Sequence, residues 1–156
     1  MAMAITLREY LDRAGIEYEL VPHPYTYNSM ETAEEARVPG DKLAKGVVLE
    51  DDDGYLMAVL PATRRLGLDL LEEHLQRRLS FATEPELGEL FDDCDIGAVP
   101  PLGKAYGCES VLDQSLLECS DVYFEAGDHT GLVHLRGEDF RRLMTSIPSG
   151  NISRHI

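Results

Sequence analysis

The sequence predicts an α+β fold: a mixed, mostly antiparallel sheet or a partly closed barrel, flanked by helices. Two pairs of strand-forming segments are each joined by a short polar turn that contains glycine, which is typical of antiparallel hairpins. Segments with helical apolar stripes are interspersed between these pairs. Because hairpins imply antiparallel pairing, the order of elements favours this class over a doubly wound parallel sheet.

The size and composition fit one folded domain. The chain has 156 residues, of which 44% are hydrophobic and 28% charged. We expect a single domain over residues 1–156, with an N-terminal helix and strand within 1–31 and a loose tail over 148–156. No apolar run approaches a membrane span, and the N-terminus lacks the pattern of a signal peptide. We therefore expect no membrane partner and a cytoplasmic location.

The first elements are predicted from capping signals. A capping box at Thr6–Glu9 opens a helix that Gly15 ends. Residues 18–21 alternate like a short strand. A second capping box, Thr32–Glu35, opens a short helix that 38–40 closes.

The middle of the chain contains the clearest hairpin. Residues 46–50 and 55–60 are rich in strand-forming side chains and are joined by the turn Asp51–Gly54. Residues 68–79 carry a leucine stripe at helical spacing. A short strand is expected over 80–82.

The last third begins with a helix capped at Thr83. Its proline and glycine content makes 92–107 a shaped loop rather than a regular element. Asp113 is expected to cap a short helix, and a second hairpin pairs 121–125 with 132–135. A final helix carries Phe140, Leu143 and Met144.

The loop from Gly97 to Gly103 is the most informative stretch for function. Two adjacent prolines fix φ and remove two backbone donors, while the flanking glycines permit close approach or positive φ. Such a loop presents a rigid backbone edge that can hold a carbonyl or a ribose through main-chain groups. The same residues also suit a plain structural turn.

Two further residues are functional candidates with structural alternatives. Lys45 stands before the apolar strand 47–49, where a charge is costly unless it has a partner or a function. Alternatively, its stem covers apolar surface and its ammonium reaches water. His129 lies in the second hairpin turn beside Asp128, which could orient or charge its ring. An exposed turn histidine is the alternative.

Several classes of function are disfavoured. A net charge of −15 argues against a protein that coats DNA or RNA backbone nonspecifically. The three cysteines are too scattered for a disulfide framework, and the histidines have no metal-ligand spacing. The sequence contains no nucleophile elbow, phosphate loop or dinucleotide fingerprint. We therefore expect no metal and no cofactor.

Three motifs together resemble a known family. Lys45 ahead of a valine-rich strand, the Gly-x-x-x-Pro loop Gly97–Pro101 extending into Pro-Leu-Gly, and the turn at Ala126-Gly127 occur in this order in YbaK-like proteins. These are aminoacyl-tRNA deacylases related to the editing insertion of bacterial prolyl-tRNA synthetase. The resemblance runs from Thr32 to Met144. It implies the YbaK/prolyl-tRNA synthetase-associated domain fold and removal of a mischarged amino acid from the tRNA 3′ end.

The resemblance also implies roles for particular residues. The family's essential lysine falls on Lys45, and its loop that holds the aminoacyl moiety falls on Gly97–Pro101. A histidine of the editing insertion matches His129, where many YbaK members have a Gly-Lys-Arg-Gly-like turn. The substrate-binding candidates are Gly97, Ala98, Val99, Pro100, Pro101, Gly103, Gly127 and His129.

The functional hypothesis is a freestanding, trans-acting aminoacyl-tRNA deacylase for a small mischarged amino acid. Its partner is the aminoacyl-tRNA 3′ end, and a synthetase is a further candidate partner. Lys42, Arg64 and Arg65 are candidates for a basic rim that contacts the tRNA end. We expect Lys45, the Gly97–Pro101 loop and His129 to line one cavity.

Two rival hypotheses remain. A noncatalytic module could use the same pocket to bind a nucleotide, an aminoacyl group or a protein partner, and the acidic composition favours it. A structural interaction protein without a pocket would be indicated by a fully exposed Lys45 that lies far from Gly97.

Overall fold

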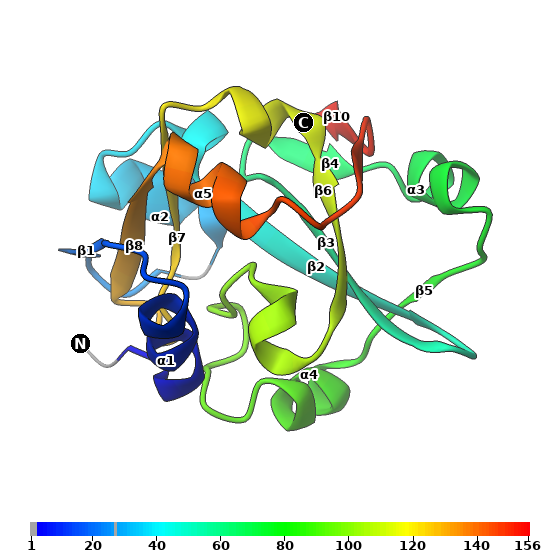
Figure 1. The fold of residues 1–156 in the computed structure, drawn as a ribbon, viewed down its shortest axis with the longest axis horizontal. Coiled ribbons are helices and arrows are strands. Elements are labelled where there is room, and N and C mark those ends of the chain that lie inside the picture. Colours follow the sequence, from blue (N-terminus) through cyan, green and yellow to red (C-terminus); the bar gives the residue numbers. More distant parts are fainter. Residues whose placement is uncertain (1–2, 27) are drawn as a thin grey trace.

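The computed structural model describes residues 3–26 and 28–156. Within these ranges, five α-helices flank a mixed sheet that is not closed into a barrel (Figure 1). The predicted α+β class is confirmed in its open-sheet form. The helices are α1 (Ile5–Arg13), α2 (Ser29–Ala36), α3 (Leu68–Leu75), α4 (Glu84–Leu90) and α5 (Gly137–Leu143), with 3₁₀ helices η1 (Gly40–Lys42), η2 (Gly103–Tyr106) and η3 (Gln114–Glu118). The strands are β1 (Glu19–Pro22), β2 (Ala44–Asp51), β3 (Gly54–Pro61), β4 (Arg64–Leu66), β5 (Ser80–Phe81), β6 (Glu109–Asp113), β7 (Asp121–Glu125), β8 (Gly131–Arg136), β9 (Ser149–Gly150) and β10 (Ser153–His155).

The main sheet has the strand order β5-β2-β3-β6-β9. β2 and β3 form the predicted hairpin, with Lys45 opposite Leu60, and β6 runs parallel to β3. The second predicted hairpin, β7 and β8, is completed by β1 into a three-stranded antiparallel sheet. β10 and β4 form a two-stranded antiparallel sheet. Both predicted hairpins are therefore confirmed, and the parallel pairs make the main sheet mixed.

The core lies on both faces of the main sheet. Side chains that alternate along β2 enter different clusters, as the two-residue period of a strand requires. Ala44 and Val48 join the larger cluster with α1, β7 and α5, whereas Leu49 joins the smaller cluster with Leu71 of α3. Residues 56–60 of β3 are almost completely buried, which agrees with a strand covered on both faces.

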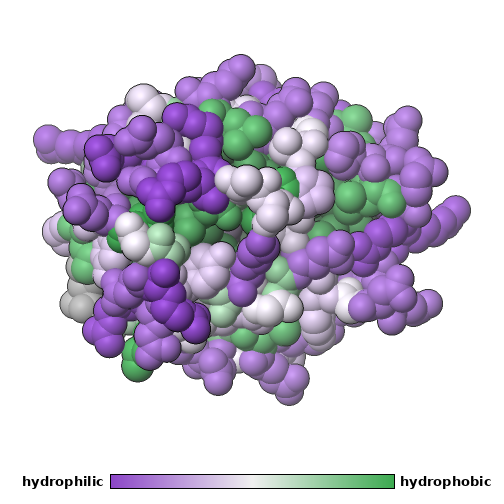
Figure 2. Space-filling model, viewed as in Figure 1, coloured by the Kyte–Doolittle hydropathy of each residue, from purple (hydrophilic) through white to green (hydrophobic). Residues whose placement is uncertain are grey.

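Hydrophilic residues cover most of the face seen in Figure 2, and apolar residues show between them across its middle. No helix in the described ranges is long and apolar enough to span a bilayer.

Two of the predicted helix starts are wrong by a few residues. The N-cap of α1 is Ala4, and the backbone N–H of Thr6 donates to Asp93 Oδ2 at 2.8 Å. The N-cap of α2 is Asn28, whose side chain accepts from the N–H of Glu31. The motif Ser/Thr-x-x-Glu does not specify which residue leaves helical geometry, because a tertiary partner or an upstream asparagine can satisfy the same donors. The capping box predicted at Thr83 is confirmed.

The predicted helix over 68–79 is too long. α3 ends at Leu75, and Gln76 adopts a left-handed conformation with φ 55°. Leu79 is still buried, and its backbone N–H donates to Glu72 Oε2 at 3.0 Å. The leucine stripe therefore continues into the core although the helix does not.

The expectation of a loose tail over 148–156 is wrong. β9 pairs with β6 and β10 pairs with β4, and Ile152 between them is fully buried. Asp113, which caps η3 as predicted, also accepts hydrogen bonds from the Ile152 N–H at 3.2 Å and the Ser153 hydroxyl at 2.8 Å. A polar segment can thus be fixed by one buried acceptor that lies about forty residues earlier, which local sequence patterns do not reveal.

Replacing Asp113 with alanine should release this tail. The change leaves the buried donors of Ile152 and Ser153 without their acceptor, so we expect a loss of about 2–3 kcal/mol in the free energy of unfolding. Urea denaturation measures it. Asp69→Ala is the matched control, because Asp69 holds Arg154 of the same tail through an exposed ion pair and should cost much less. Equal losses for the two variants would contradict the role of Asp113.

Candidate functional site

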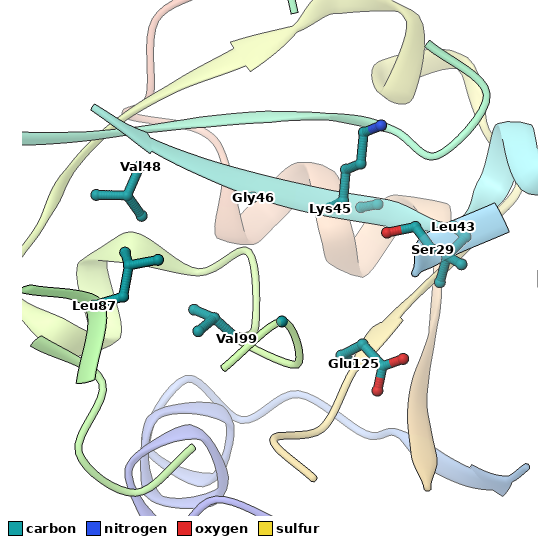
Figure 3. Close-up of a pocket in the computed structure, with 10 residues that line it drawn as sticks. Ser29, Leu43, Lys45, Gly46, Val48, Leu87, Val99 and Glu125 are labelled. Carbon is teal, nitrogen blue, oxygen red and sulfur yellow. The ribbon is translucent and has the colours of Figure 1, made fainter. Parts of the chain in front are cut away.

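A cavity of about 150 Å³ lies beside the first half of β2 (Figure 3). Its volume is below the roughly 300–1,000 Å³ of pockets that enclose whole small molecules, so it suits a small chemical group. The lining comes from β2, the start of α2, α4, the glycine-proline loop and β7. These residues are Ser29, Leu43, Ala44, Lys45, Gly46, Val48, Leu87, Gly97, Val99 and Glu125.

One wall of the cavity is an open strand edge. On the side of β2 away from β3, β5 pairs only with Leu49 and Glu50, and a single bridge joins Leu43 to Tyr123. Between these points no described strand pairs with β2. The Val48 carbonyl accepts from the Ala82 N–H at 3.0 Å, so the peptide groups left available to a ligand are those before Val48 that face away from β3. Gly46 lies in this interval. A Cβ at Gly46 would approach Met57 Sδ to 2.9 Å, which explains the absence of a side chain.

The facing wall is the glycine-proline loop, which the β7–β8 turn holds in place. The Asp95 N–H donates to the Gly127 carbonyl at 2.7 Å, and the His129 ring lies 2.6 Å from the Ile96 carbonyl, so its Nε2–H donates. Gly97 has φ 87°, and a Cβ there would approach His129 Cε1 to 3.0 Å. This position therefore requires glycine.

The loop contributes two residues with unused backbone donors to the cavity wall. Gly97 and Val99 both line it, and neither backbone N–H donates to an acceptor elsewhere in the described chain, whereas the intervening Ala98 N–H donates to Asp95. Two such N–H groups can bind a carbonyl oxygen and the negative charge that develops on it.

A buried carboxylate, Glu125, closes another side of the cavity. It ends β7, and its side chain is 12% exposed. Its Oε1 lies 3.5 Å from Nε2 of His23, whose side chain is fully buried. The His23 Nδ1 lies 2.8 Å from the Pro24 carbonyl, so Nδ1–H donates and Nε2 faces the carboxylate. Glu125 Oε2 has no hydrogen-bond partner among the described residues.

Sequence reasoning missed Glu125 and His23. The signal was the one that identified Lys45: a charge beside apolar residues, here Phe124 of β7 and Ala126 just after it, both of which are buried. His23 was considered only as a metal ligand. The described residues contain no group of three His, Cys, Asp or Glu side chains that could hold a metal ion.

Burial raises the pKa of the Glu125 carboxyl above its ordinary value of 4.5, and the nearby His23 is the main influence that opposes the rise. The folded protein therefore holds this proton more tightly than the unfolded chain, and stability falls as the pH rises from 4.5 through the raised pKa. We expect Glu125→Gln to melt at a higher temperature than the parent at about pH 8, with the difference vanishing near about pH 4.

Asp121→Asn is the control for this prediction. Asp121 lies on β7, as Glu125 does, and it also pairs with a histidine, His134 of β8. The hydrogen bond with His134 lowers the pKa of Asp121, so its contribution to stability is present at neutral pH and is lost as the pH falls. This variant should be less stable than the parent at neutral pH. Thermal melts across the pH range measure the direction of the stability change in both variants. A Glu125→Gln variant that is less stable than the parent at about pH 8 would contradict the prediction for Glu125.

Lys45 lies at the edge of the cavity rather than inside it. Its side chain rises on the side of β2 away from Val99 and Glu125 (Figure 3). The ammonium donates one long hydrogen bond, 3.4 Å, to the Ala62 carbonyl and forms no ion pair with any described residue. Burial lowers the pKa of this half-buried group. Lys45 is therefore neither fully exposed nor neutralised by a partner.

The other predicted substrate-binding residues lie behind the cavity wall. Ala98, Pro100 and Pro101 are buried within the loop. Gly103 packs against Ser110 and the Cys108 carbonyl, and Gly127 packs against Ala4. His129 is buried with φ 64° and packs against Tyr25, with ring centroids 5.0 Å apart and the ring planes tilted by 45°. The expected single cavity thus includes Lys45, Gly97 and Val99, whereas His129 supports the loop from the far side.

None of the three predicted rim cations lines the cavity. Lys42 Nζ lies 3.5 Å from the Ser120 hydroxyl. Arg64 donates to the hydroxyl and carbonyl of Ser153 at 2.6 and 3.0 Å, so it ties β4 to the C-terminal strand. Arg65 is exposed on β4.

Comparison with known structures supports the fold. A structure named "putative trans-editing enzyme for prolyl tRNA synthetase" aligns with a TM-score of 0.84 and 23% identity, over 97% of this chain and 96% of that one. A hypothetical protein, APE2540, aligns with a TM-score of 0.82 and 21% identity, over 96% and 99%. The curated protein sequences contain no match.

The family comparison covers the site. The model of the aminoacyl-tRNA editing domain matches residues 23–143, which include every residue that lines the cavity. With a glycine-proline loop facing an open strand edge across a small cavity, and with this match over most of its length, the chain belongs to the aminoacyl-tRNA editing domain family.

Proposed function

We propose that this chain is a trans-acting aminoacyl-tRNA deacylase that hydrolyses the ester of a mischarged small amino acid on tRNA. The observation that carries the proposal is the small cavity in which Gly97 and Val99 face the open β2 edge, with Lys45 beside it. The family match and the likeness to a structure named for trans-editing support it. That name also makes tRNA for proline the first substrate to test and prolyl-tRNA synthetase a candidate partner.

The chemistry requires few protein groups. An aminoacyl ester is already activated, so a correctly positioned water molecule or terminal ribose hydroxyl can attack it without a side-chain nucleophile. We assign the N–H groups of Gly97 and Val99 to the ester carbonyl oxygen, whose negative charge grows in the transition state. Burial raises the pKa of Cys94 to about 12 and of Cys108 to about 11, so neither supplies a thiolate at neutral pH.

We assign Lys45 to the phosphate of the terminal adenosine. The aminoacyl group enters a cavity too small for the nucleotide, which leaves the adenosine at its edge, where the Lys45 ammonium lies. A half-buried ammonium that pairs with no carboxylate in residues 3–26 and 28–156 can accept an anionic ligand without first breaking an ion pair there. This assignment requires only one local cation, which is compatible with a net charge of −15.

Amino acid selection follows from the cavity's apolar lining, which comes from Leu43, Val48, Leu87 and Val99. A pocket of fixed size excludes larger side chains, as in a second editing sieve. Val99→Ala removes two methyl groups from the wall, and we expect the ratio of kcat/KM for valyl over alanyl esters to rise about tenfold. Parallel hydrolysis assays on one tRNA measure this ratio, and an unchanged ratio would remove Val99 from the selection of size.

The rival function is a noncatalytic module that binds a nucleotide, an aminoacyl group or a protein partner in the same cavity. The acidic charge and the orientation of Lys45 away from Glu125 favour it. Incubating the purified protein with a panel of mischarged tRNAs separates the two functions. Ester hydrolysis supports the deacylase, whereas measurable binding without turnover on any substrate supports the module.

A further inference from the structure

The cavity contains a charged group that the deacylase assignment above does not use. Of the ten lining residues, Lys45 and Glu125 are the two with acidic or basic side chains, and the Lys45 side chain rises away from the cavity. The carboxylate of Glu125 is therefore the charge that a bound group meets. An aminoacyl ester carries a positive group of matching size, its α-ammonium.

The position of Glu125 is fixed rather than adventitious. Its Oε1 faces His23 Nε2 at 3.5 Å, and His23 is itself oriented by donating Nδ1–H to the Pro24 carbonyl. His23 Nε2 forms no hydrogen bond with any described residue, so its contact with Oε1 is an ion pair when the ring is protonated. The second oxygen, Oε2, is buried and has no partner among the described residues.

A buried carboxylate oxygen without a hydrogen bond is unfavourable in the free protein. Such a cost is maintained where a ligand supplies the missing donor. An ammonium ion has three N–H donors and a full positive charge, so it satisfies Oε2 with the strongest class of hydrogen bond. A neutral hydroxyl or an N-acylated amine carries no positive charge and therefore forms a weaker hydrogen bond with Oε2.

We propose that Glu125, positioned by His23, binds the α-ammonium of the aminoacyl group and so restricts the site to esters with a free amine. The inference rests on the proposed deacylase function and names the feature of the substrate that it recognises. In an aminoacyl ester the ammonium and the carbonyl are attached to neighbouring carbons. Binding the first at Glu125 and the second at Gly97 and Val99 fixes the orientation of the ester, and the amino acid side chain then lies against the apolar lining.

The test compares esters that differ only at the amine. One tRNA is charged with an amino acid, with its N-acetyl derivative and with the corresponding 2-hydroxy acid, and hydrolysis is measured for the parent, Glu125→Gln and Asp121→Asn. We expect the parent to prefer the free amine by roughly 10- to 100-fold in kcat/KM. Glutamine keeps the shape of the side chain but not its charge, and should reduce this preference at least tenfold. The Asp121 variant should keep it.

A binding arm separates this inference from the deacylase itself. The probes are 3′-aminoacylamino-3′-deoxyadenosine, in which an amide replaces the ester, and its N-acetyl form, titrated by calorimetry. Tighter binding of the free amine that Glu125→Gln abolishes, without turnover of any tRNA, would support the subsite and overturn the deacylase. Turnover by a parent that treats all three esters alike would overturn the subsite and leave the deacylase standing. That comparison uses the parent alone, so it holds even if the glutamine variant fails to fold.

Discussion

Replacing Lys45 with alanine is expected to abolish deacylation while leaving the protein folded. The substitution removes the cation assigned to the terminal phosphate, and its loss should lower kcat/KM at least a hundredfold. Folding should survive, because the ammonium forms one long hydrogen bond and because burial disfavours its charged form and so lowers its pKa. Hydrolysis assays with thermal melts of the same samples measure both effects.

The matched control is Lys104→Ala. Lys104 is exposed on η2, does not line the cavity and donates to the Ser146 hydroxyl. The Lys104→Ala substitution removes the same charge as Lys45→Ala, so any general electrostatic effect on tRNA binding appears in both variants. A Lys45→Ala protein that hydrolyses every parental substrate at the parental rate would remove Lys45 from the mechanism.

The second large effect is expected for Gly97→Ala. An alanine there would be strained at φ 87°, and its Cβ would approach His129 Cε1 to 3.0 Å. Relief of this contact moves the loop or the histidine, and either movement displaces the N–H groups of Gly97 and Val99. Loss of an oxyanion donor costs about 10²–10³ in kcat, and we expect a fall of this size at the substrate concentration that saturates the parent.

Gly107→Ala separates backbone strain from damage to the site. Gly107 has φ 70°, but a Cβ there meets nothing within 4 Å, and it lies outside the cavity lining. Both variants should lose some stability through the left-handed backbone, while only Gly97→Ala should lose activity. If both variants retained parental kcat, the loop would not supply the oxyanion donors.

The parts of the fold that could be predicted depend on local patterns. The β2–β3 hairpin follows from a polar turn between two apolar strands, and the Thr83 capping box from residues that contact one another within one turn. The C-terminal strands could not be predicted this way. They depend on Asp113, a distant acceptor whose partners become apparent only when the chain is folded.

The same distinction applies to the site. Gly97 and Lys45 were identified because glycine beside proline and a charge before a strand are visible in sequence, and both line the cavity. His129 was expected in the cavity, but it bonds to the Ile96 carbonyl behind the loop, which no spacing indicates. Glu125 was missed because its importance comes from its burial beside His23, a residue about one hundred positions away.

The central claim is tested most directly by single-turnover hydrolysis of tRNA for proline charged with alanine, against the same tRNA charged with proline. A deacylase with the small cavity described above should release alanine faster than the uncatalysed ester decays, and the Lys45→Ala protein should not. No acceleration with alanine or with any other small amino acid in the panel, by a protein that is folded and binds the charged tRNA, would contradict the account.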